Sequence, residues 1–265
     1  MDSIQLIGYI LAVLVGVTLG LIGSGGSIVS VPIFVYILGV EPVLATAYSL
    51  FVVGVTAFIG GIQKARQQLV DYNKVMLFGI PTLITVFCTR KFLVPAIPDV
   101  VWQYNAWLLR KPTVIMVFFA IVMIVAAVKM IRSQIPDVGG FKSKYDYLKI
   151  ILQGIGIGLI AGFVGAGGGF LIVPSLMFLT RMPMKKAVGT SLFVVAIQSL
   201  VGFLGDVQNN IDVNWNMLLI FIFAAIIGVF IGNNLAKKIN GDKLKKGFGW
   251  FVFVIGIYII FKELL

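Results

Sequence analysis

The chain has 265 residues, of which 60% are hydrophobic and only 12% are charged, and its mean hydropathy is +1.06. Soluble domains are about half apolar and about a quarter charged, so this composition excludes an ordinary soluble protein. Continuous apolar runs of bilayer-spanning length favour membrane helices over a β-barrel, in which apolar and polar residues alternate.

The formal net charge is +11, and the basic residues are scattered through short loops. This distribution is typical of the cytoplasmic loops of a multispan protein, and it lacks the interleaved aromatic residues of a nucleic-acid-binding patch. Cys88 is the only cysteine and there is no histidine. An intrachain disulfide is therefore excluded, the commonest metal ligand is missing, and we expect neither a metal nor a cofactor.

The first apolar segment, residues 3–38, contains a glycine-serine cluster at 23–27 and reaches Pro32 soon after it. The segment is too long for one membrane span and too short for two spans with a turn, so it predicts a hairpin of two part-helices that meet at the cluster. Apolar spans follow at 45–62, 74–93 and 112–131. A polar linker at 132–148, expected to be cytoplasmic, ends this half.

The second half repeats the first. It has a broken hairpin at 149–180 with its meeting point at 165–169, then Pro174, then spans at 187–204, 215–236 and 247–263. The offset along the chain that takes Gly20 to Gly162 also takes Ser49 to Ser191, without a gap. The sequence therefore predicts an all-α polytopic membrane protein with two repeats, 1–131 and 149–265, each made of a glycine-broken hairpin and three transmembrane helices.

The two repeats are expected to have inverted topology, because a hairpin that does not cross leaves each repeat with three crossings. Loop charges support this. The loop at 39–42 has no basic residue and its partner at 181–186 has three, whereas the loop of Lys64, Arg66 and Lys74 is basic and its partner at 205–213 has none. Basic loops inside place both termini outside. The alternative is a full span for each opening segment, which gives parallel repeats.

The loop at 90–111 disagrees with this scheme. It should lie outside, yet it carries four basic residues. It also contains Trp102, Tyr104 and Trp107, so we expect it to lie along the membrane interface as an amphipathic segment.

The glycine breaks are the candidate substrate site. A helix broken at membrane depth must be buried or line a wet cavity, and the amides and dipole of the following half-helix favour an anion. The candidate substrate-binding residues are Gly23, Ser24, Gly25, Gly26, Ser27, Ser49, Gly165, Gly167, Gly168, Gly169, Thr190, Ser191 and Gln198, with Pro32 and Pro174 as structural residues. The alternative for the isolated polar residues is hydrogen bonding between helices, and for the glycine pairs 16/20 and 228/232 it is close helix packing.

No ionisable residue lies near the centre of any predicted span, which argues against a proton relay of side chains. There is no histidine base, no pair of buried carboxylates and no nucleotide-binding loop, so we expect no enzymatic activity.

Two glycine segments of the type G-x-x-G-x-G-G, each followed by a proline, together with A-x-x-x-S-L-F-V-V downstream of each, resemble the sulfite exporter TauE/SafE family, also called the 4-toluene sulfonate uptake permease family. The resemblance covers nearly the whole chain. Its motif residues correspond here to Gly23, Gly25, Gly26, Pro32 and Ser49, and to Gly165, Gly167, Gly168, Pro174 and Ser191.

What the resemblance implies is a multi-pass permease of the cell inner membrane that moves sulfite, thiosulfate, sulfonate or sulfoacetate. The expected partners are such an anion and the lipid bilayer, without nucleic acid, and a homodimer stays open. Two alternatives of other classes are a membrane anchor or scaffold for a soluble partner and a membrane enzyme.

Overall fold

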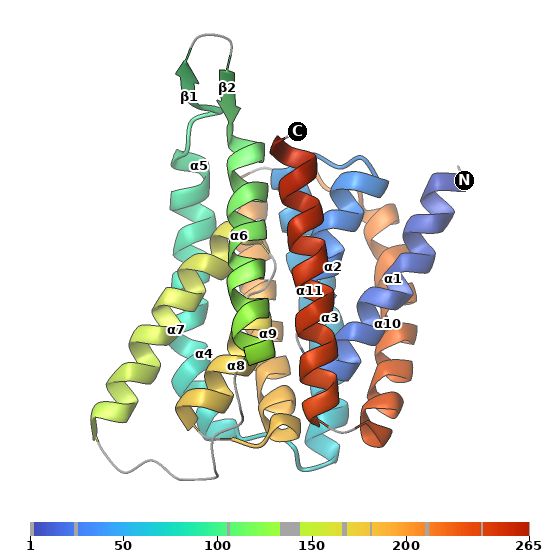
Figure 1. Ribbon diagram of the computed structural model, residues 1–265, viewed down its shortest axis with the longest axis vertical. Helices are drawn as coiled ribbons and strands as arrows, with labels where there is room; N and C mark the ends of the chain where they lie inside the picture. The colour runs from blue at the N-terminus through green and yellow to red at the C-terminus, as the bar shows by residue number, and fades with distance from the viewer. Residues whose placement is uncertain are drawn as a thin grey trace.

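A computed structural model describes residues 3–23, 26–104, 107–132, 144–165, 169–180, 182–209, 212–239 and 241–264 (Figure 1). The first half contains α1 (Ser3–Ile22), α2 (Gly26–Pro32) with its π-helical continuation η1 (Ile33–Ile37), α3 (Pro42–Arg66), α4 (Tyr72–Cys88) with its π-helical continuation η2 (Thr89–Leu93), α5 (Val94–Ala96), the strands β1 (Val100–Tyr104) and β2 (Trp107–Arg110), and α6 (Lys111–Arg132). The second half contains α7 (Lys144–Val164), α8 (Gly169–Thr180), α9 (Met184–Val207), α10 (Trp215–Lys238) and α11 (Gly241–Leu264).

Each predicted span lies within an observed helix: 45–62 in α3, 74–93 in α4 and η2, 112–131 in α6, 187–204 in α9, 215–236 in α10 and 247–263 in α11. Both opening segments are interrupted helices, α1 before α2 and α7 before α8. The first arm of the first hairpin, α1, has 20 residues, as the predicted bounds imply, whereas that of the second, α7, has 21 and is longer than expected. α7 begins at Lys144, within the predicted linker.

Local signals in the sequence explain where several helices begin. Glu41 accepts a hydrogen bond from the N–H of Leu44 at 3.1 Å and so caps α3. In the same way Asp71 caps α4 and Asn214 caps α10. A side-chain oxygen at this position satisfies one of the free N–H groups of the first helical turn.

In the described residues, six helical stretches are long and apolar enough to cross a membrane. They are α1 from Gln5 onward, α3, the continuous stretch from α4 through α5, α6, α9 and α10. Large apolar side chains point outward, for example Phe223, Ile227 and Phe230 on α10. A soluble monomer rarely exposes apolar surface on this scale, so these side chains contact lipid. The all-α polytopic membrane fold is confirmed.

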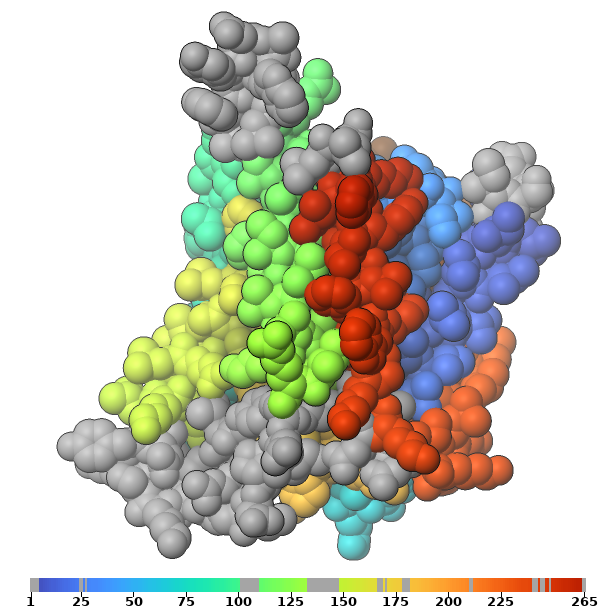
Figure 2. All heavy atoms as spheres, in the orientation of Figure 1, coloured from blue at the N-terminus to red at the C-terminus, as the bar shows by residue number. Residues whose placement is uncertain are grey.

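The main helix contacts join the two halves of the chain. α1 packs on α10 and α7 packs on α4, while α3 packs on α9 and α6 on α11. Figure 2 shows α6 and α11 side by side along one face. Exchanging each helix of one half for its equivalent in the other leaves this set of contacts unchanged. In Figure 1, α1 begins at the upper end of the bundle, the end at which the C-terminus also lies, whereas α7 begins at the lower end. Inverted repeats predict that these two equivalent helices begin at opposite ends of the bundle. The repeat relation itself stays an inference.

Glycine allows the closest of these contacts. A Cβ atom on Gly16 of α1 would overlap the Ala225 carbonyl of α10, and one on Gly20 would lie 2.5 Å from the Val229 oxygen. Gly228 of α10 would likewise overlap the Val13 carbonyl. The packing interpretation of these glycine pairs is confirmed, because small residues let two helix backbones approach.

The loop between α5 and α6 differs from the expectation of an amphipathic interfacial segment. β1 and β2 form an antiparallel hairpin in which Tyr104 pairs with Trp107, and it projects beyond the helices at the upper end (Figure 1). Aromatic and β-branched residues are concentrated in this stretch and favour strands, which explains the difference.

Candidate substrate site

Both helix breaks occur at a glycine with a left-handed backbone. α1 ends at Ile22, and Gly23 has φ of 80° and donates its N–H to the Leu19 oxygen at 2.6 Å. α7 ends at Val164, and Gly165 has φ of 69° and donates to the Ala161 oxygen at 2.9 Å. Glycine commonly ends helices in this conformation because it has no Cβ to clash.

Each break lies against the first helix after the other hairpin. A Cβ on Gly23 would lie 2.8 Å from the Val188 oxygen of α9, and one on Gly165 would lie 2.8 Å from the Thr46 Cα of α3. Thr46 and Val188 are themselves equivalent positions of the two repeats, as Gly23 and Gly165 are. The two halves therefore hold each other's hairpins in the same way, and α2 also contacts α8.

The predicted polar residues of α3 and α9 are completely buried. The Ser49 hydroxyl lies 2.6 Å from the Ser30 hydroxyl of α2, and the Ser191 hydroxyl donates to the Val188 oxygen at 2.9 Å. Thr190 accepts a hydrogen bond from the Asp71 N–H at 3.0 Å, so its hydroxyl joins the start of α4 to α9. The Ser49 hydroxyl thus contacts the first hairpin, whereas the hydroxyls of Ser191 and Thr190 bond to the backbone of α9 and of Asp71.

The other predicted residues lie as follows. Gly26 opens α2 and packs on α1, where an added Cβ would lie 2.7 Å from the Val15 oxygen. Ser27 and Pro32 lie within α2, Gly169 opens α8, Pro174 lies within α8, and Gln198 lies in α9. Ser24, Gly25, Gly167 and Gly168 lie outside the described residues. Across the described part of the chain, no group of histidine, cysteine, aspartate and glutamate side chains could hold a metal ion.

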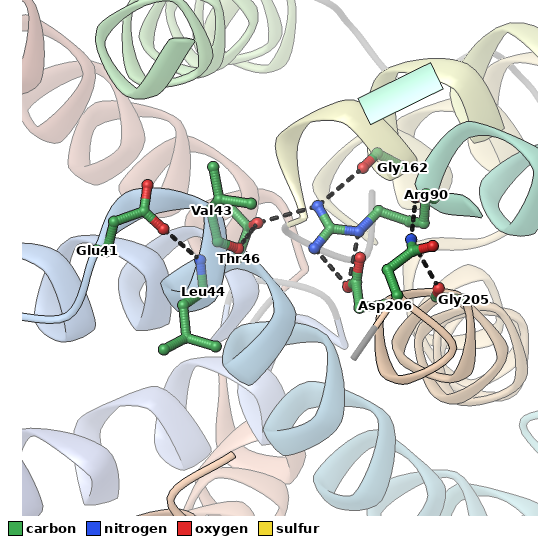
Figure 3. Close-up of polar contacts among 9 residues, drawn as sticks. Glu41, Val43, Leu44, Thr46, Arg90, Gly162, Gly205 and Asp206 are labelled. Carbon is green, nitrogen blue, oxygen red and sulfur yellow. Dashed lines mark hydrogen bonds and ion pairs between the residues drawn. The ribbon is translucent and has the colours of Figure 1, made fainter. Parts of the chain in front are cut away.

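The structure adds an ion pair that sequence reasoning missed. Arg90 of η2 is fully buried, and its Nε donates to the Asp206 carboxylate of α9 at 2.8 Å (Figure 3). Its Nη1 donates to the Thr46 hydroxyl at 3.0 Å and to the Gly162 oxygen at 3.4 Å. One side chain therefore joins η2, α9, α3 and α7 beside the second break, at the upper end of the bundle.

This pair corrects the charge assignment of two loops. The sequence prediction counts Arg90 with the basic loop at 90–111 and Asp206 with the acidic loop at 205–213. Both belong to helices and neutralise each other inside the protein. The predicted inverted topology would put the ends of the spans 74–93 and 187–204 on one side of the membrane. Opposite charges at those two ends were the sequence signal that could have indicated the pair.

A cavity of about 130 Å³ opens at the lower end of the bundle. Its charged lining residues are Lys64 at the end of α3, Lys185 at the start of α9 and Lys237 at the end of α10. Leu21, two residues before Gly23 at the first break, and Val188, which faces Gly23, also line it. The lower end thus has a cavity that reaches the first hairpin, while the Arg90–Asp206 pair occupies the corresponding place at the upper end.

Comparison with known proteins agrees with this architecture. The family model described as "Sulfite exporter TauE/SafE" matches residues 9–259. The chain belongs to the TauE/SafE family.

Several relatives cover nearly the full length of the chain. A "Probable membrane transporter protein" of Xylella fastidiosa (strain Temecula1) is 29% identical over 94% of this chain and 92% of its own length. A protein of the same name from Haemophilus influenzae is 28% identical over 99% of this chain and 100% of its own. YunE of Bacillus subtilis, also named a probable membrane transporter protein, is 28% identical over 87% of this chain and 86% of its own length. No solved structure matched. This TauE/SafE family member is a multi-pass membrane transporter.

Proposed function

We propose that the chain is a permease for small sulfur-containing anions, of the class sulfite, thiosulfate, sulfonate or sulfoacetate, that works by alternating access. The observation that carries the proposal is the matched position of the two glycine breaks, Gly23 against Val188 and Gly165 against Thr46. The description of the family as sulfite exporters supports the substrate class.

The chemistry of the breaks suits an oxyanion. α8 begins at Gly169 and has 12 residues, so its first turn presents N–H groups and the positive end of the helix dipole at the second break. Hydroxyl groups of Ser30, Ser49 and Ser191 lie on the helices that contact the hairpins. In our proposal, amides and hydroxyls replace the water around the anion without a fixed counter-charge, which lets the anion leave again.

The packing suits alternating access. Each hairpin is held by the other half, so a tilt of one half against the other changes both ends at once. The open cavity at the lower end and the buried Arg90–Asp206 pair at the upper end are what a conformer open to one side would have. We infer an inner-membrane location with the lysine-rich lower end in the cytoplasm and both termini outside, following the positive-inside rule.

Counterflow in proteoliposomes tests the proposal. Vesicles preloaded with unlabelled sulfite or thiosulfate are expected to accumulate the ³⁵S-labelled anion in a saturable way, and protein-free vesicles are the control. Absence of saturable flux for every sulfur anion tried, with folded protein in the membrane, would refute the permease. Turnover of the compound without flux would indicate a membrane enzyme, and co-purification of a soluble partner without flux would indicate an anchor.

A further inference from the structure

The cavity at the lower end has three lysines and no acidic residue among its lining residues. Lys64 is only 4% exposed, so its charge is largely removed from water. The positive charges of Lys185 and Lys237 act on it as well. In the described residues, the ion pairs are Lys74–Asp71 and Arg90–Asp206, and Lys64 takes part in neither. A buried ammonium group without a counter-charge is unfavourable.

The start of α9 faces the same cavity, because its first two residues, Met184 and Lys185, are lining residues. The residue before them is Pro183, whose side chain makes no capping hydrogen bond. The 24-residue helix α9 therefore directs free backbone N–H groups and the positive end of its dipole toward this end of the bundle. Lysine side chains and helix terminus both favour a negative charge at one place.

The other half of the protein shows how such a place is neutralised from within. At the offset that relates the two repeats, Pro183 corresponds to Glu41, whose carboxylate caps α3 (Figure 3). Lys64 corresponds to Asp206, whose carboxylate neutralises Arg90. The upper end thus has two carboxylates at the positions where the lower end has a proline and a lysine. The chain supplies the negative charge at one end and leaves it out at the other.

We propose that the cavity of Lys64, Lys185 and Lys237 is a binding site for a small free oxyanion, which takes the place that carboxylates occupy at the opposite end. A volume of about 130 Å³ is well above the roughly 10–15 Å³ that one water molecule needs, so the cavity has room for a small hydrated anion. The site therefore suits an inorganic anion of sulfite or thiosulfate size. Because Leu21 and Val188 connect the cavity to the first break, an anion held here stands at the lower entrance of the transport path.

Direct binding tests the site without transport. The purified protein in neutral detergent is dialysed against ³⁵S-sulfite, a choice of probe that rests on the proposed function. Saturable binding is expected, with competition by thiosulfate. Lys185→Gln and Lys237→Gln are each expected to weaken binding at least tenfold, and Lys64→Gln by more, because Lys64 is the most buried of the three.

Neighbouring lysines supply matched controls. Lys186→Gln and Lys238→Gln remove the same charge one residue away, at positions that do not line the cavity, and are expected to stay within twofold of the unchanged protein. If Lys64→Gln fails to fold, comparing the Lys185 variant with the Lys186 variant, and the Lys237 variant with the Lys238 variant, still shows whether the cavity lysines bind the anion.

Equal effects within each pair would overturn the site, since general surface charge would then explain the binding. Displacement of sulfite by added phosphatidylglycerol would also overturn it and assign the cavity to a lipid headgroup. Lysine-dependent binding without flux in proteoliposomes would refute the permease and leave the site intact. Flux without such binding would refute the site alone.

Discussion

Adding one methyl group at each of four glycines separates the two reasons for which this fold uses glycine. Gly156 lies within α7 with nothing within 4 Å of an added Cβ, so Gly156→Ala is expected to raise the free energy of unfolding by about 0.5–1 kcal/mol. Gly39 has equal space but φ of 66°, so Gly39→Ala is expected to lower it by about 1–2 kcal/mol through backbone strain alone.

The other two positions add steric overlap. Gly16 does not have a left-handed backbone, but its Cβ would lie 2.7 Å from the Ala225 carbonyl carbon, so Gly16→Ala is expected to cost about 1–3 kcal/mol. Gly165 combines φ of 69° with overlap onto the backbone of Thr46. Gly165→Ala is therefore expected to cost the sum of both effects, about 2–5 kcal/mol.

Thermal unfolding of the four variants in one detergent, followed by the loss of helical circular dichroism, measures the order. The expected order of stability is Gly156→Ala, then unchanged protein, then Gly39→Ala and Gly16→Ala, then Gly165→Ala. If Gly165→Ala were no less stable than Gly39→Ala, the second break would not be held against α3. The two hairpins would then not be held in matched positions.

Two further changes test the polar contacts. Asp206→Asn leaves the buried Arg90 charge without its counter-charge and is expected to lower the free energy of unfolding by about 3–5 kcal/mol. The double change Arg90→Met with Asp206→Leu is expected to recover most of this loss. Equal stability of the single and the double variant would contradict the buried pair. Thr190→Val removes the acceptor of the Asp71 N–H and is expected to cost about 1–3 kcal/mol, with Thr56→Val, whose hydroxyl bonds only within its own helix, as the milder control.

The sequence repeat predicted the breaks closely, because both have one local cause. A glycine with a left-handed backbone ends each first arm, and the ends of α1 at Ile22 and α7 at Val164 are equivalent positions of the two repeats. The glycine pairs of α1 and α10 were also predictable, since spacing of four residues places both glycines on one helix face. The helical spans followed from apolar length alone.

The Arg90–Asp206 pair and the lysine cavity depend on which helix ends meet in space. Sequence reasoning treats Lys64 as an ordinary basic loop residue, because its burial comes from α9 and α10, which lie far along the chain. Ser49, Thr190 and Ser191 are grouped as candidate ligands with hydrogen bonding between helices as the alternative, and Thr190 accepts such a bond from the Asp71 N–H. Residue type and spacing do not distinguish these cases, because the distinction lies in tertiary contacts.

The packing of α1 on α10 also means that α1 is synthesised well before the helix it packs on. The glycine face of α1 leaves the ribosome long before Ala225, which it touches in the finished protein. At about 5–20 residues per second, α1 waits about 10–40 s in the bilayer for its partner. A flat, apolar glycine face tolerates that wait among lipid chains, whereas an exposed polar face would not. The first half of the chain therefore enters the membrane with the glycine face of α1 exposed to lipid, and α10 covers this face once the second half has been synthesised.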